Sequence, residues 1–384
     1  MKSAAPRPPS TPLLPKRATP AASPPGQRRL MRWALTLFGF ALSLALVANA
    51  FVEPSLADGR LSLTPRFALD AWIGDLPRHL AWVLPFAACA AAILPLRALG
   101  WGLALGHTRA PPLAARYHAV ATGAFVHNAL PFGLGDLCRA QLLSRRHALP
   151  LFEGLGAALV CKLFEFVALI ALASLAIFAT RLGPGAPSQV GLHSALPLAA
   201  TLALFLVALC ALAARFLWPF ARLLESRGRL PRLARALRSL GQGLTPIRSL
   251  RQCLQLALAA LGPVLMPALG YGLALQGVGV ERGLLFGPLL LGAITLSQFS
   301  VGLPIGVGMY YLSATWAARA LGVPADDAAA LACLTHLTTV ATHLALGAVS
   351  IALFRVRPGD FWPGRIERAR APSKATFDRE ETTS

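Results

Sequence analysis

Two short stretches decide the fold of this chain, Leu130-Pro-Phe-Gly-Leu-Gly135 and Leu303-Pro-Ile-Gly-Val-Gly308. Both read L-P-x-G-x-G, and they lie 173 residues apart. Each interrupts an apolar region, about 117–143 and 284–318, that is otherwise long enough to cross a bilayer. Because Pro and Gly break helices and freed backbone groups cannot face lipid, we expect each break to be buried in protein or to line a wet cavity.

The composition indicates a membrane protein. Of the 384 residues, 55% are hydrophobic and 14% are charged, and the mean hydropathy is +0.59. A soluble domain averages about 25% charged residues. Yet 36 Lys and Arg stand against 16 Asp and Glu, a net charge of +20. Such hydrophobicity and such charge coexist when they are segregated along the chain, as in a polytopic membrane protein with basic cytosolic loops.

Further apolar stretches have the length of full membrane spans. They cover about residues 33–52, 79–99, 154–180, 191–214, 253–276 and 328–354. The predicted fold class is therefore all-α, a polytopic membrane helix bundle with about six full spans and two broken, re-entrant helical hairpins. We expect a disordered basic cytosolic tail over 1–32, an integral membrane domain over 33–354 and a disordered cytosolic tail over 355–384.

The distribution of charge orients this bundle. The loop 215–251 carries nine Arg and one Glu, and the tail 1–32 carries seven Lys and Arg without an acid. The loops expected on the other side together hold six Arg and seven acids. The positive-inside rule then places both termini in the cytosol. We expect the protein to lie in the inner membrane of a cell. Ala48-Asn49-Ala50 would also suit a signal peptidase, and that alternative stays open.

The two motifs predict an inverted repeat. Three predicted spans separate them, and an odd number of crossings inverts the second copy. The first hairpin should then enter from the cytosol and the second from the periplasm. Inverted repeats with paired broken helices are typical of transporters that bind their substrate near the midplane. The alternative is a structural bundle with ordinary kinked helices.

Two pairs of charged residues stand in apolar surroundings, and each pair has i,i+3 spacing on one helical face: Asp136 with Arg139, and Lys162 with Glu165. A charge within a span costs about 2.5–3.5 kcal/mol on insertion scales, so it needs a partner or a purpose. Arg139 could hold a lipid phosphate through two hydrogen bonds, with Asp136 orienting it. The alternative is that both are structural ion pairs.

Other polar residues near the breaks are candidate substrate contacts. Asn128 precedes the first motif, where its amide could also satisfy freed backbone groups, and Gln298 stands similarly close before the second motif. Tyr310 and Tyr311 follow the second motif and equally suit an interfacial aromatic belt. His336 shares a helix face with a histidine seven residues on. It could relay protons, or simply hydrogen-bond to a neighbouring helix.

Several classes of function are disfavoured. The chain has no H-E-x-x-H, P-loop or G-x-S-x-G motif, and its six cysteines are dispersed without C-x-x-C. We therefore expect no enzymatic activity, no cofactor and no metal site. The Arg-rich loop 215–251 has Leu between its basic residues, which suits an anionic membrane surface rather than a nucleic acid.

The run from Asn128 to Leu143 resembles the flippase-like transmembrane domain family, which includes the membrane half of lysylphosphatidylglycerol synthases. Cys161-Lys162-Leu-Phe-Glu165 is similar to a family span that bears a basic–acidic pair, and 302–324 is similar to the second Pro- and Gly-rich block. Where the family commonly has Arg-Glu after the second glycines, this chain has Met309-Tyr310-Tyr311. We expect no aminoacyl-transferase domain, so the resemblance carries no expectation of lipid aminoacylation.

The resemblance implies transport or flipping of a phospholipid or lipid-linked substrate, with membrane lipids, anionic ones above all, as partners. Two alternatives stay open. One is a secondary transporter of small solutes or ions with the same inverted architecture. The other is a non-transporting membrane scaffold for a lipid-modifying or glycosyltransferase partner.

Overall fold

The computed structural model describes the greater part of the chain. The described ranges are 52–57, 60–65, 76–106, 110–129, 134–181, 215–226, 231–299 and 306–357, with isolated positions outside them. The helices with defined bounds are α3 (Leu76–Leu105), α4 (Leu113–Ala129), α5 (Gly135–His147), α6 (Leu151–Arg181), α8 (Pro231–Gly243), α9 (Leu250–Gly277), α10 (Gly283–Phe299), α11 (Gly306–Ala320) and α12 (Ala325–Leu353).

Four of these helices, α3, α6, α9 and α12, are long and apolar enough to cross a membrane. They coincide with the predicted spans 79–99, 154–180, 253–276 and 328–354, so the predicted helix bundle is confirmed. The remaining predicted spans, 33–52 and 191–214, lie almost wholly outside the described residues. Both tails, 1–32 and 355–384, lie largely outside them as well.

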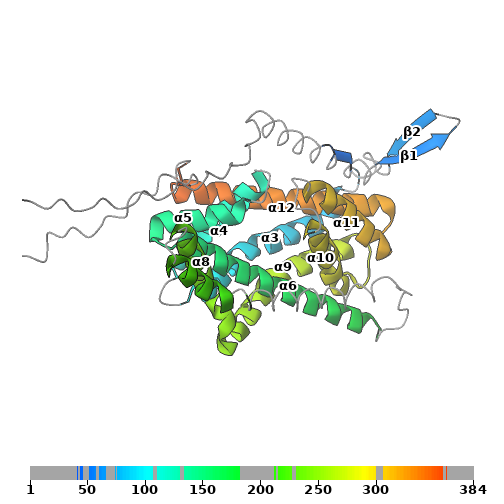
Figure 1. The fold of residues 1–384 in the computed structure, drawn as a ribbon. Coiled ribbons are helices and arrows are strands. Elements are labelled where there is room, and N and C mark those ends of the chain that lie inside the picture. The colour runs from blue at the N-terminus through cyan, green and yellow to red at the C-terminus, as the bar shows by residue number, and fades with distance from the viewer. Residues whose placement is uncertain are drawn as a thin grey trace, which may run out of the picture.

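A short antiparallel strand pair precedes the helix bundle. Strand β1 (Val52–Ala57) pairs with β2 (Arg60–Pro65), with Val52 opposite Pro65 and Ala57 opposite Arg60. This pair projects from one end of the bundle (Figure 1). The pair lies between the predicted spans 33–52 and 79–99.

Each of the two interrupted regions is a pair of short helices. Helices α4 and α5 flank the first motif, α10 and α11 flank the second, and their lengths are 17, 13, 17 and 15 residues. A helix needs about 20 residues to span a bilayer, so each of these is too short to do so alone. The tips of both motifs, 130–133 and 300–305, lie outside the described residues.

The backbones of α4 and α5 touch where the sequence supplies glycine. A Cβ placed on Gly135 would lie 2.4 Å from the Gly123 carbonyl oxygen, and a Cβ on Gly123 would lie 2.8 Å from the Gly135 oxygen. In the second pair, the Ser297 hydroxyl of α10 donates to the Ser313 hydroxyl of α11 at 2.8 Å. Each pair is therefore a tight hairpin of two helices.

The order of the helices repeats. Helices α3, α4, α5 and α6 have 30, 17, 13 and 31 residues, and α9, α10, α11 and α12 have 28, 17, 15 and 29. Left-handed glycines follow the first helix of each set, Gly106 at φ 80° and Gly279 at φ 95°. These glycines have the same separation as the two L-P-x-G-x-G motifs. Only glycine adopts this conformation without steric cost, so the turn at the helix end recurs with its residue.

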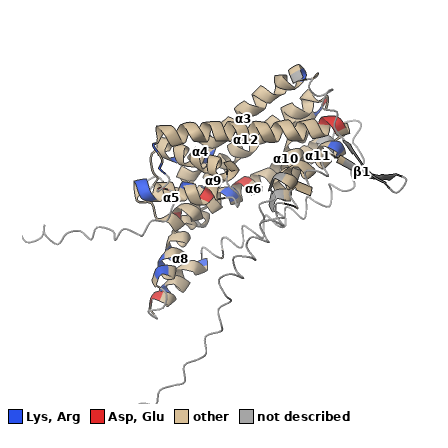
Figure 2. Cartoon of the chain, turned by 90° about the horizontal axis from the view of Figure 1, so that it is seen from above, with Lys and Arg blue, Asp and Glu red and all other residues tan. Residues whose placement is uncertain are grey.

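The contacts between the two sets are reciprocal. Helix α4 packs on α12 as α10 packs on α6, and α3 packs on α12 as α9 packs on α6. Helices α3 and α9 pack on each other and run antiparallel, because Gly262 lies against Leu96 and Gly277 against Trp82. Figures 1 and 2 accordingly show the α4–α5 hairpin at one end of the bundle and the α10–α11 hairpin at the other.

The buried apolar residues form one large cluster around each hairpin. The cluster beside α4 and α5 includes Trp101, Leu142 and Leu143, and the cluster beside α10 and α11 includes Phe86 and Leu290. Helices α3 and α9 contribute to both, the opposite end of each helix to each cluster. The bundle therefore positions two comparable sites, one beside each hairpin.

Candidate functional site

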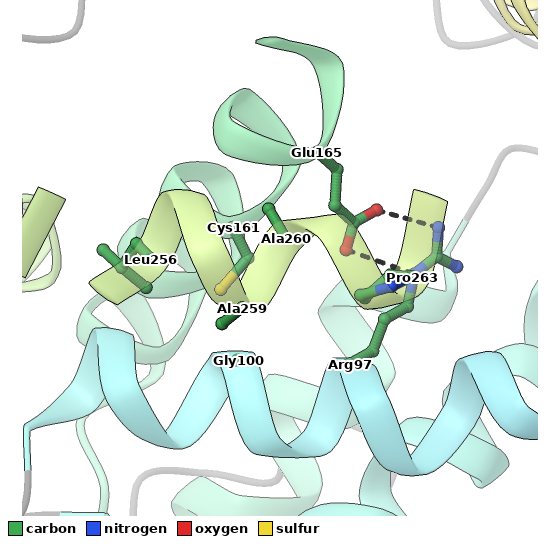
Figure 3. Close-up of a pocket in the computed structure, with 8 residues that line it drawn as sticks. All are labelled: Arg97, Gly100, Cys161, Glu165, Leu256, Ala259, Ala260 and Pro263. Atoms are coloured by element: carbon green, nitrogen blue, oxygen red, sulfur yellow. Dashed lines mark hydrogen bonds and ion pairs between the residues drawn. The ribbon is translucent and has the colours of Figure 1, made fainter. Parts of the chain in front are cut away.

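Ion pairs connect three helices beside the first hairpin. The Asp136 carboxylate in the first turn of α5 accepts from Lys162 of α6 and, at 2.8 Å, from Arg139 Nη2 one turn further along α5. Glu165, one turn beyond Lys162, accepts two hydrogen bonds from Arg97 of α3, at 2.9 and 3.3 Å. Figure 3 shows the Arg97–Glu165 contact.

The helices explain these positions. Asp136 stands in the first turn of α5, where the helix dipole favours a negative charge. Asp136 and Arg139 pair within one helix turn, as their spacing allows. Lys162 and Glu165 have the same spacing, but each finds its partner on another helix. The sequence alternative of a self-neutralised Lys162–Glu165 pair is therefore not what the structure contains.

Arg139 is the most enclosed cation of the group, with a side chain 9% exposed. Its guanidinium lies 5.0 Å from the centre of the Trp101 ring, and the Trp101 indole donates to the Gly154 carbonyl at 3.2 Å. Within the described part of the chain, Arg139 Nε has no hydrogen-bond partner. The site thus holds a buried cation with an unused donor, which suits an anionic oxygen.

A small pocket opens beside this network between α3, α6 and α9 (Figure 3). Arg97, Glu165 and Cys161 line it on one side. Small and apolar residues complete it: Gly100, Leu256, Ala259, Ala260 and Pro263. The ion-paired group contains the cations Arg97, Arg139 and Lys162 against the anions Asp136 and Glu165, so its net charge is +1.

The corresponding place beside the second hairpin is built from hydroxyl groups. The Tyr310 hydroxyl of α11 lies 2.8 Å from the Tyr271 hydroxyl of α9 and 2.9 Å from Thr335 Oγ1 of α12. The Tyr311 hydroxyl lies 3.2 Å from His336 Nδ1, and the His336 ring is 4.7 Å from the Tyr310 ring. With the motif spacing, Thr335 stands where α6 has Lys162. The two sites therefore differ in charge.

Asn128 and Gln298 are the remaining predicted site residues. Asn128, near the end of α4, donates to the Ala124 carbonyl at 2.8 Å, and its amide nitrogen lies 3.5 Å from His343 Nδ1. The Ala124 carbonyl lies within α4, one turn before Asn128, so both roles suggested for Asn128 stay predictions. Gln298 lies in α10, and its side chain is outside the described residues.

Sequence reasoning missed Arg97, Trp101 and Tyr271 as members of these sites. Arg97 had a usable signal, because it is a charge within the predicted span 79–99. Trp101 and Tyr271 resemble ordinary apolar span residues, and only the contacts of Trp101 with Arg139 and of Tyr271 with Tyr310 reveal them. Among the described residues, no group of three His, Cys, Asp or Glu side chains could hold a metal ion.

Comparison with known proteins agrees with this architecture. A family model described as the lysylphosphatidylglycerol synthase TM region matches residues 67–347, which include both helix sets up to the last turns of α12. No curated protein and no solved structure matches the chain. Since the family match covers well over half of the sequence, this multi-pass membrane protein belongs to the lysylphosphatidylglycerol synthase transmembrane-region family.

Proposed function

We propose that this protein translocates an anionic phospholipid or lipid-linked substrate between the leaflets of the inner membrane, without covalent chemistry. The observation that carries the proposal is the positively charged ion-pair network of α3, α5 and α6. A structural bundle gains little stability from buried ion pairs, because desolvation offsets their attraction. Arg139, enclosed and with an unused donor, is the natural ligand for a phosphate oxygen.

The reciprocal helix contacts support an inverted repeat as the basis of this transport. A two-fold rotation that exchanges the helix sets α3–α6 and α9–α12 exchanges each cross-contact with another. It also exchanges α3 with α9, which are antiparallel neighbours. An axis that relates antiparallel spans runs perpendicular to them, in the plane of the membrane. The hairpins then enter from opposite sides, as in transporters that work by alternating access.

Charge supports a cytosolic position for the first hairpin and for both termini. Figure 2 shows Lys and Arg on α5 and α8, and both lie at the end of the bundle that holds the first hairpin. The end that holds the second hairpin carries acids and bases together, among them Asp326, Asp327 and Arg319. The positive-inside rule assigns the basic end to the cytosol.

The network suggests how a head group would be held and released. An arriving phosphate would compete with the Asp136 carboxylate for Arg139 and Lys162, and hydrogen bonds to charged groups contribute about 1.5–3 kcal/mol each. Asp136 would recover its partners when the site empties. Beside the second hairpin, the hydroxyl groups of Tyr310 and Thr335 offer weaker contacts to an anion, which favours release.

Reconstitution in liposomes tests this proposal. Lipids with labelled head groups of anionic, zwitterionic and uncharged classes are scored for exchange between leaflets, and recovered lipid is analysed by mass spectrometry for chemical change. Lys162→Ala should slow exchange of anionic lipid at least about tenfold, a loss of about 1.4 kcal/mol. Arg235→Ala, which removes an exposed cation of α8 outside the network, is the control and should retain the wild-type rate. Absence of exchange of every class by folded protein would refute translocation.

A further inference from the structure

A groove separate from the ion-pair network lies on the side of the bundle between α3, α9 and the start of α4. It has a volume of about 670 Å³. Its lining residues are Leu96, Leu99, Gly102, Leu103, Ala110, Pro111, Pro112, Leu113, Arg116, Leu258, Ala259 and Gly262. Arg116 is the only charged residue among them. Leu258 is 71% exposed, so the groove opens on the outer surface of the bundle, which faces lipid in a membrane.

The groove has one cation and an otherwise apolar or small-residue lining. Arg116 and Pro111 lie at the end of the bundle where α3 finishes and α4 begins. The Arg116 guanidinium reaches α3 at the Ala98 and Leu99 carbonyls, and the side chains of Leu96, Leu99 and Leu103 line the groove beside it. A single amphipathic molecule, with an anionic group at the guanidinium and an apolar chain beside it, fits this lining.

Backbone carbonyls hold the Arg116 guanidinium in place and leave part of its N–H donors unused. Its Nε donates to the Pro111 carbonyl at 2.9 Å, and Nη1 donates to the Ala98 carbonyl at 2.7 Å and reaches Leu99 O at 3.4 Å. Within the described residues, the second amino group, Nη2, makes no hydrogen bond. A guanidinium has five N–H groups in a rigid fork, so Nη2 can still donate to a phosphate oxygen.

Gly102 leaves the space that the Arg116 guanidinium occupies. A Cβ placed on Gly102 would lie 1.3 Å from Arg116 Nη1, so any other residue at 102 would expel the guanidinium from its seat against α3. The groove therefore contains a cation that three backbone carbonyls hold in place, with apolar side chains beside it. Arg116 therefore differs from a surface arginine whose side chain points freely into solvent.

We propose that this groove binds one phospholipid of the adjacent leaflet, with its phosphate on Arg116 Nη2 and an acyl chain along Leu96, Leu99 and Leu258. Charge complementarity selects the phosphate, and the apolar lining selects the chain. Ala259 lines both this groove and the pocket beside Arg97, so a lipid bound here lies next to the ion-pair network. The proposal concerns binding alone and does not depend on translocation.

Photo-crosslinking of the full chain in nanodiscs tests it. The probes are phosphatidylglycerol and diacylglycerol with the same photoactivatable acyl chain, so that they differ in the phosphate head group. Crosslinked residues are mapped by mass spectrometry. We expect phosphatidylglycerol to label the groove residues on α3 and α9 at least about fivefold more than diacylglycerol. Equal labelling by both probes, or even labelling along all exposed helix faces, would overturn the proposal.

Three variants make the test specific. Arg116→Gln should reduce the groove labelling by phosphatidylglycerol at least about fivefold. Leu258→Trp fills the groove from an exposed position on α9, and it should reduce the labelling as well. Arg319→Gln removes an exposed arginine at the opposite end and should leave it unchanged. Wild-type labelling in both groove variants would refute the site, whatever the outcome of the leaflet-exchange assay.

Discussion

Asp136 is the shared anion of the first site, because its carboxylate accepts hydrogen bonds from both Lys162 and Arg139. Truncating it leaves two cations without a counter-charge in an apolar setting. Truncating Lys162 instead leaves Asp136 paired with Arg139. The structure therefore predicts unequal effects for two residues that the sequence presents as equivalent members of i,i+3 pairs.

A double-mutant cycle measures this coupling. Asp136→Leu should lower the stability of the protein more than Lys162→Met, and the double variant should be more stable than the sum of the single losses predicts. A coupling of about 0.5–3 kcal/mol is usual for residues in one charge network. The measurement is thermal unfolding in detergent, with Arg235→Met in α8 as an exposed control. Strict additivity would show that the Asp136–Lys162 contact contributes nothing.

At the scale of single residues, the sequence predicts which side chains belong to the network better than it predicts which side chains they pair with. Asp136, Arg139, Lys162 and Glu165 stand out because a charge in an apolar run is costly, and all four take part in the network. Spacing shows which residues share a helix face but not which helix that face meets. The pairing of Glu165 with Arg97 across 68 residues therefore needed the structure.

Among the elements, the first hairpin depends on glycine contact between its helices. Gly135→Ala would place a Cβ 2.4 Å from the Gly123 oxygen of α4, and backbone cannot yield as a flexible side chain does. We expect a loss of about 1–3 kcal/mol, typical of overpacking, measured by thermal unfolding. Gly292→Ala in α10 is the matched control, because its Cβ would have nothing within 4 Å. It should be neutral, or stabilise by up to about 1 kcal/mol through helix propensity. Equal effects would contradict the close approach.

The end of α12 is fastened to the end of α5 outside the spans. Arg146 donates to the Phe354 carbonyl and, at 3.0 Å, to the Arg355 carbonyl, and it pairs with Asp360 at 2.9 Å. Burial tends to raise the pKa of Asp360. Hydrogen bonds from the Arg357 amide and from Arg146, with the charge of Arg146, outweigh it, so the pKa lies below its usual value.

This lowered pKa predicts an acid-labile contact. An acid whose pKa is depressed on folding stabilises the folded state above its unfolded pKa of about 3.9, and that stabilisation is lost as the pH falls through the folded pKa. We expect hydrogen exchange of the Arg357 amide to accelerate below about pH 4, after correction for intrinsic rates. Asp360→Asn should show fast exchange at neutral pH already and no further acid step. A wild-type step that persists in Asp360→Asn would assign it to another group.

At the scale of the whole molecule, hydropathy predicts elements and leaves their arrangement open. The apolar runs gave α3, α6, α9 and α12 to within a few residues, and the Pro- and Gly-rich motifs gave both interruptions. Apolar runs and Pro- and Gly-rich motifs are local properties of the sequence. The reciprocal packing of α4 on α12 and α10 on α6 depends on side-chain fit between distant segments, which no local pattern encodes.

The antiparallel course of α3 and α9 leads to a prediction about sidedness. If the two helix sets are inverted, the open ends of the hairpins face opposite sides of the membrane. In a cysteine-free background, Arg145→Cys at the end of α5 should react with a membrane-impermeant maleimide only from the cytosol. Glu281→Cys, before α10, should react only from the periplasm. Both positions are exposed, so access depends on side and not on burial.

Arg235→Cys in α8 calibrates the assay, because α8 lies at the same end of the bundle as the first hairpin (Figure 1). It should follow Arg145→Cys in every condition. If Arg145→Cys and Glu281→Cys reacted from the same side, the long helices could not all cross the bilayer, and a rocking mechanism between inverted halves would fail. If Arg235→Cys and Arg145→Cys reacted only from the periplasm, the halves would stay inverted and the charge-based orientation alone would be wrong. The two outcomes separate the architecture of the bundle from its direction in the membrane.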